Sequence, residues 1–174
     1  MDFLTLAKKR YSVRAYTKQK VEKEKLNAIL EAAHAPTGGN CQPQHLIVVQ
    51  SENGLSKIGK AANIYGAPLA IIVCSDIEKT WTRPFDGKKL TDIDASIITD
   101  HMMMEATDLG LGSVWVCYFK PSVLKTEFNL PSNLEPVNIL AIGYADTSHE
   151  TVLPSNRHNK MRLPLSATVS FEEL

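Results

Sequence analysis

Two short basic clusters, one near each end of the chain, contain the residues with the clearest chemical potential. Arg10, Ser12 and Arg14 lie close together in the sequence, and Lys160 and Arg162 form a matching pair near the other end. Guanidinium, ammonium and hydroxyl groups bind a phosphate monoester through charge-assisted hydrogen bonds. The chain has 19 basic and 19 acidic residues, so a general excess of cations does not explain the clusters. They predict a specific anionic ligand, against the alternative of solvated surface cations.

Length and composition indicate an ordinary globular chain. The 174 residues, 44% hydrophobic and 22% charged, predict a single domain over residues 1–174. The balanced charge argues against a general nucleic-acid binder, and no apolar run is long enough to span a membrane. Three widely spaced cysteines predict neither a disulfide framework nor a zinc site, and the N-terminus does not resemble a signal peptide. We therefore expect a cytoplasmic protein.

Helix and strand patterns alternate along the chain, which predicts a mixed sheet covered by helices. A polar stretch over residues 76–89, with Trp81, predicts a long exposed loop. The apolar spacing predicts helices over residues 2–9, 21–33, 52–60 and 91–109 and from 121 onward, and strands over residues 45–50, 69–74, 113–119, 137–144 and 167–171.

The helix expected over residues 91–109 is apolar around most of its circumference. Ile97, Ile98 and the triplet at residues 102–104 spread its apolar side chains widely, and such a helix is buried on most faces. It is either the core helix of a monomer or a central helix that a second subunit also covers. The isolated extended segment expected at 167–171 favours exchange with the sheet of a partner.

Other catalytic motifs do not account for the chain. Gly110 and Gly112 lack a third glycine and lie between a helix and a strand, the reverse of a dinucleotide fingerprint. The sequence has no P-loop and no nucleophile elbow, and its histidines lack the spacing of metal ligands. Cys41 has no histidine and asparagine pattern to support it as a nucleophile.

Four segments, in order, resemble the nitroreductase family of FMN-dependent oxidoreductases. The segment 10–14 resembles the Arg-Arg-Ser-x-Arg opening of that family, and 35–43 resembles its Pro-Ser-x-x-Asn-x-Gln-Pro-Trp element. The segment 108–116 resembles its Leu-Gly-Leu-Gly-Ser-x-Trp element, and 160–165 resembles its C-terminal Lys-x-Arg. Each motif alone is weak, but the ordered set covers nearly the whole chain.

The resemblance implies an α+β nitroreductase-like fold with a central mixed, mainly antiparallel sheet. It implies a homodimer that exchanges its C-terminal extensions and holds FMN at the subunit interface. In the ping-pong mechanism of the family, NAD(P)H reduces the flavin and leaves before a nitroaromatic, quinone or similar conjugated acceptor is reduced in the same pocket. A same-fold flavoenzyme with dehalogenase or oxidase chemistry is one alternative, and a non-catalytic FMN-binding or storage protein is another.

The resemblance also implies roles for individual positions. Backbone N–H groups of Cys117 and Tyr118 would face flavin N5 and O4, and Asn40 and Gln42 would approach from the other subunit. The chemistry is carried by the flavin, so no catalytic side chain is expected, and the loop over 76–89 is the candidate cover of the pocket. The full set of expected FMN-binding residues is Arg10, Tyr11, Ser12, Arg14, Pro36, Thr37, Asn40, Gln42, Cys117, Tyr118, Lys160 and Arg162.

Overall fold

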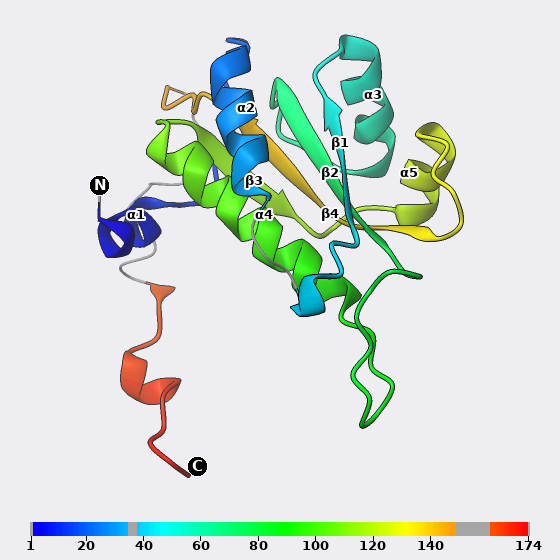
Figure 1. The fold of residues 1–174 in the computed structure, drawn as a ribbon. Coiled ribbons are helices and arrows are strands. Elements are labelled where there is room, and N and C mark those ends of the chain that lie inside the picture. The colour runs from blue at the N-terminus through cyan, green and yellow to red at the C-terminus, as the bar shows by residue number, and fades with distance from the viewer. Residues whose placement is uncertain (1, 35–37, 149–160, 174) are drawn as a thin grey trace.

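The computed structural model describes residues 2–34, 38–148 and 161–173, which form a four-stranded sheet with helices on both faces (Figure 1). The strand order is β1-β2-β4-β3, and every neighbouring pair is antiparallel. The expected α+β fold is therefore confirmed. The sheet was expected to be mixed, but the pairs formed by its four strands are all antiparallel. The strands are β1 (Gln44–Val49), β2 (Leu69–Asp76), β3 (Gly112–Val116) and β4 (Leu134–Gly143).

The helices agree closely with the pattern of apolar residues. The helix expected over residues 21–33 begins two residues later, at Lys23. No helix in the described part of the chain is long and apolar enough to cross a membrane. The helices are α1 (Phe3–Lys9), α2 (Lys23–Ala32), α3 (Glu52–Ala61), α4 (Thr91–Asp108) and α5 (Pro121–Glu127), with short 3-10 turns η1 (Gly38–Asn40) and η3 (Leu165–Ala167).

The two central strands are apolar because both of their faces are covered. All residues of β2 are buried, and its side chains alternate between two hydrophobic clusters. Ile72 contacts the cluster that α3 and α5 complete, whereas Ile71 contacts the one that α2 and α4 complete. A strand covered on both faces has a continuous apolar run rather than an alternating pattern, which is why this strand could be predicted directly from the sequence.

Helix α4 is buried along most of its length, as its all-round apolar character predicted. Ile98 and Met102 are fully buried against the sheet. The helix ends where Gly110 adopts the left-handed conformation at φ 78°. Two hydrogen bonds complete this cap, from Gly110 N to Thr107 O at 3.1 Å and from Leu111 N to Ala106 O at 2.8 Å. The cap turns the chain directly into β3.

The segment 10–17 after α1 extends the sheet at the ends of β3 and β4. Ser12 forms an isolated parallel bridge with Ser113, and Tyr16 forms an antiparallel bridge with Ala145. Among the described residues, the bridge between Ser12 and Ser113 is the only parallel strand pairing. Because β3 is an edge strand, this segment covers part of an edge that would otherwise expose unpaired backbone groups.

The C-terminal segment 161–173 extends away from the sheet beyond α1 (Figure 1). All of it is exposed, including the apolar side chains of Leu163, Leu165 and Phe171. The strand expected over residues 167–171 is wrong, because Ala167 ends a 3-10 turn and the residues after it form turns and bends. An isolated extended segment needs a neighbouring strand for its backbone hydrogen bonds, and the described residues place no strand beside it.

Candidate active site

The first basic cluster is held against the edge strand β3. Val13 N donates to Ser113 O at 2.9 Å, and Asp146 N donates to Ala15 O at 3.0 Å. Gly112 allows this approach, because a Cβ atom at that position would lie 2.6 Å from Val13 Cγ2. The backbone of the cluster is therefore fixed by the sheet, and its side chains project from a defined edge.

Arg10 lies in the wall of a cavity of about 150 Å³ formed by the end of α1, the end of α4 and the start of β3. Its side chain is half-buried, and Nη1 lies 3.7 Å from Met103 Sδ. Ser113 also lines the cavity, and its buried hydroxyl has no hydrogen-bond partner among the described residues. Ser113 is only 1% exposed, so this orphaned hydroxyl is costly unless a ligand pairs with it. A cavity lined by an arginine and by a serine with an unpaired hydroxyl suits an anionic group.

The residues that follow Arg10 have different environments. Tyr11 packs against the hydrophobic core between the sheet and helices α3 and α5, and Ser12 is half-buried beside β3. Arg14 is exposed, and its guanidinium carbon lies 5.9 Å from the ring centroid of Tyr65. Tyr16 is structural, because burial raises the pKa of its phenol and its hydroxyl donates to a backbone oxygen of β4.

Cys117 and Tyr118 directly follow the C-terminal end of β3, whereas Ser12 lies beside its N-terminal end. Both are exposed, with 96% of Tyr118 accessible. The strand expected over residues 113–119 ends at Val116, where pairing with β4 stops. Phe119 N then donates to Cys117 O at 3.2 Å, and the next backbone N–H, of Lys120, donates to the end of α3. The main chain of Cys117 and Tyr118 is thus positioned by a turn tied to α3.

Two residues that the sequence analysis did not select lie near Arg14 and Tyr118. Asn63 and Tyr65 belong to the connection from α3 to β2, where Asn63 Oδ1 accepts a hydrogen bond from Tyr65 N at 2.8 Å. Tyr65 contacts Arg14, and Asn63 lines the same cavity as Tyr118. The available signal was the Asn-Ile-Tyr-Gly turn sequence at residues 63–66, which marks a tight loop but not a ligand.

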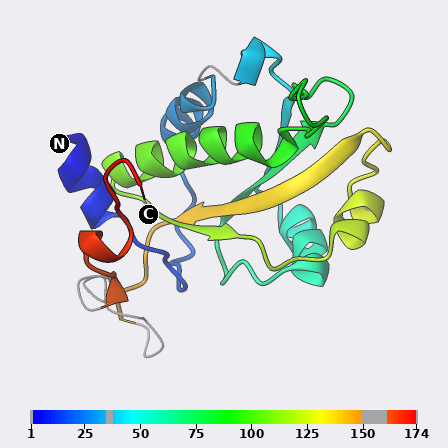
Figure 2. The ribbon, with the colours of Figure 1, turned by 90° about the horizontal axis from the view of Figure 1, so that it is seen from below.

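Asn40 and Gln42 lie at the opposite side of the chain. They precede β1, the edge strand farthest from β3 in the strand order. Both have a positive φ, and Gln42 Nε2 donates to Asn40 Oδ1 at 3.1 Å. Figure 2 shows α1 and the η1 turn toward opposite ends of α4. Within one chain, the structure does not bring these two residues to the Arg10 segment.

Other expected site residues are only partly covered by the structure. Arg162 is exposed on the C-terminal segment, whereas Pro36, Thr37 and Lys160 lie outside the described residues. The loop over 76–89 packs against the η1 turn, since a Cβ at Gly39 would lie 2.8 Å from the Trp81 ring. In its own chain this loop therefore lies beside Asn40 rather than over the Arg10 cavity.

A family model described as the nitroreductase family matches residues 7–64 and 56–144 of the chain. The chain belongs to the nitroreductase family. A crystal structure of a family protein from Clostridium difficile 630 is 61% identical to this nitroreductase-family chain, with a TM-score of 0.94 and full coverage of both chains.

Two further relatives carry more specific names. The FMN reductase [NAD(P)H] of Bacillus subtilis is 28% identical, over 90% of this nitroreductase-family chain and 68% of its own length. The structure of an FMN-dependent nitroreductase from Clostridium difficile R20291 is 28% identical, with a TM-score of 0.76, and covers 99% of this chain and 100% of its own.

Proposed function

We propose that this chain is an FMN-dependent oxidoreductase that takes electrons from NAD(P)H and reduces a small conjugated acceptor such as a nitroaromatic or a quinone. The observation that carries the proposal is the half-buried Arg10 beside a cavity with an orphaned Ser113 hydroxyl. The same sheet edge carries Ser12 and ends at the exposed residues Cys117 and Tyr118. Membership of the nitroreductase family and relatives named for FMN and NAD(P)H support the same conclusion.

Each group at this edge has a distinct task toward the cofactor. Arg10 pairs with the phosphate, which carries nearly two negative charges at neutral pH, and Lys160 and Arg162 add further cations. Ser12 and Arg14 bind the ribityl chain and the ring edge. The backbone N–H groups beyond β3 donate to the ring, where main-chain donors stabilise negative charge without depending on side-chain identity. When bound, FMN supplies hydride acceptance and donation, which no side chain provides.

We further propose that the active unit is a homodimer with FMN at the interface. Asn40 and Gln42 lie at the sheet edge opposite β3, so only a second copy can bring them to the ring. The C-terminal segment supports exchange between subunits, because Leu163, Leu165 and Phe171 are each at least 70% exposed. Exposed apolar side chains gathered on one short segment are typical of a surface that a partner covers. The NAD(P)H donor and the free thiols also support the cytoplasmic location expected from the sequence.

The absorbance spectrum tests the cofactor and the reaction together. We expect purified protein to be yellow, to bleach on anaerobic addition of NADH or NADPH, and to regain colour on addition of nitrofurazone or menadione. A colourless protein that takes up no FMN would refute the proposal. Flavin that binds but is not bleached by either nucleotide would instead support a storage protein.

Solution mass tests the dimer. Sedimentation at micromolar concentration should give twice the mass of 19.2 kDa, and truncation after residue 160 should shift the protein to monomer and weaken FMN binding. A truncated protein that stays dimeric and keeps its flavin would remove the role assigned to the C-terminal segment. A Phe171→Ser variant provides a milder change of the same segment.

A further inference from the structure

A second cavity, of about 350 Å³, lies beside Tyr118 between the end of α3 and the turn that follows β3. Lys60, Asn63 and Lys120 supply its polar groups. The two walls are joined by the hydrogen bond from Lys120 N to Ala61 O, at 3.1 Å. This cavity is therefore a built feature of the fold, adjacent to the backbone that we assign to the flavin ring.

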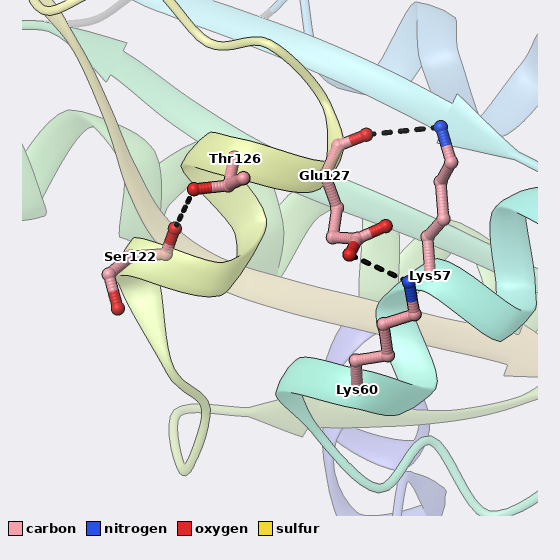
Figure 3. Close-up of polar contacts among 5 residues, drawn as sticks. All are labelled: Lys57, Lys60, Ser122, Thr126 and Glu127. Carbon is pink, nitrogen blue, oxygen red and sulfur yellow. Dashed lines mark hydrogen bonds and ion pairs between the residues drawn. The ribbon is translucent and has the colours of Figure 1, made fainter.

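The two lysines that line the cavity, Lys60 and Lys120, differ in whether a carboxylate pairs with them. Lys60 Nζ lies 2.7 Å from Glu127 Oε1, and Lys57 Nζ donates to Glu127 O at 3.1 Å, as Figure 3 shows. Glu127 therefore neutralises Lys60 and ties α3 to α5. Within the described residues, the ammonium of Lys120 is paired with no carboxylate. Lys120 gives the cavity a net positive charge.

The other walls suit a flat molecule. Tyr118 is 96% exposed, so its ring is free to stack on an aromatic ligand. Asn63 lines the cavity and already uses its carbonyl oxygen to accept from Tyr65 N, so its amide group can act toward a ligand as a donor. A ring, a donor and a cation thus surround one space.

We propose that this cavity receives the electron acceptor and that Lys120 selects acceptors with a carboxylate or phosphate group on an aromatic ring. The proposal rests on the proposed function, because Tyr118 is adjacent to the reacting ring only if FMN binds along β3. A volume of about 350 Å³ is near the lower end of the range for ligand pockets. It therefore suits a single-ring acceptor rather than a whole dinucleotide.

The test compares 4-nitrobenzoate with the neutral 4-nitrobenzyl alcohol in the flavin-containing protein. Lys120→Met should lower kcat/KM for 4-nitrobenzoate about three- to tenfold and change that for the alcohol less than twofold. Lys120→Arg should retain the preference, and the matched variant Lys23→Met, which removes an exposed cation on α2, should change neither. The preference should shrink in high salt, because screening weakens an exposed ion pair.

A binding measurement separates this proposal from the proposed function. Calorimetric titration with benzoate, which cannot be reduced, should show a similar rise in Kd for Lys120→Met. Equal losses for both acceptors, or an unchanged benzoate Kd, would overturn the selection by Lys120. A change confined to the ratio of NADPH to NADH would assign the cation to the donor and also overturn it. If NAD(P)H fails to bleach the wild-type flavin, the proposed function fails, while the benzoate titration still decides the role of Lys120.

Discussion

Replacing Arg10 by methionine removes the cation that we assign to the FMN phosphate while it keeps an unbranched side chain of comparable length. A hydrogen bond to a charged group contributes about 1.5–3 kcal/mol, which corresponds to a loss of about 10- to 150-fold in affinity. The side chain is half-buried beside its cavity, so solvent screens it less than an exposed cation. We therefore expect Arg10→Met to raise the Kd for FMN at least about 10-fold.

The assay is quenching of flavin fluorescence when apoprotein is titrated with FMN and, separately, with riboflavin. Riboflavin lacks the phosphate, so its Kd should be nearly unchanged in Arg10→Met. Lys8→Met removes an exposed cation from α1, the helix that ends just before Arg10, and serves as the matched control. The difference between FMN and riboflavin should decrease below about pH 6, where the phosphate loses one of its charges.

Two outcomes would refute this reasoning. An equal loss for FMN and riboflavin would mean that Arg10 acts on the ring or on the fold rather than on the phosphate. No loss for either flavin would remove Arg10 from the site. Thermal unfolding followed by circular dichroism distinguishes the first case from general damage, because Arg10 also contacts Met103 at 3.7 Å.

Three further predictions concern the elements that position the site. Gly112→Ala should destabilise the protein by about 1–3 kcal/mol in urea unfolding and weaken FMN binding, because the new Cβ lies 2.6 Å from Val13 Cγ2. Thr99→Val should lower the free energy of unfolding by about 1–3 kcal/mol, since buried Asn138 Nδ2 loses the hydroxyl to which it donates at 3.1 Å. Cys74 should resist thiol reagents near pH 8 until the protein is unfolded, because burial raises the pKa of its thiol to about 12.

Each of these predictions has an internal control. Gly59→Ala places a Cβ in open space on α3 and should stabilise the protein by about 0.5–1 kcal/mol; equal destabilisation by both glycine variants would contradict the steric argument. Thr99→Ser keeps the hydroxyl and should recover most of the loss. Exposed Cys117 should react readily in the folded protein, and equal reactivity of Cys74 would contradict its burial.

Most of the fold could be predicted because the main elements have patterns that local chemistry explains. The apolar run of β2 follows from its coverage on both faces, and the length and end of α4 follow from its apolar residues and Gly110. The segment 167–171 was misread because β-branched and aromatic residues indicate a strand only if a partner strand is present. A local pattern contains no information on that partner.

Part of the candidate site was also predictable from the sequence, and part became visible only in the structure. The sequence singled out the side chains of Arg10, Ser12 and Arg14 by their chemistry, and the resemblance to the nitroreductase family selected the backbone at Cys117. It did not reveal Asn63, because an asparagine in a turn is usually explained by the turn itself. Only the contact between the end of α3 and the segment after β3 shows that Asn63 and Tyr118 share a cavity.

The sequence by itself determined which side chains can bind an anion and where the helices and central strands lie. These properties follow from residue type and from periodicity over short segments. The tertiary structure alone decided that the Arg10 segment lies against β3 while Asn40 lies at the other edge, before β1. Strand order results from long-range pairing and from the packing of helices on both faces, so residues distant in sequence become neighbours only when the sheet forms.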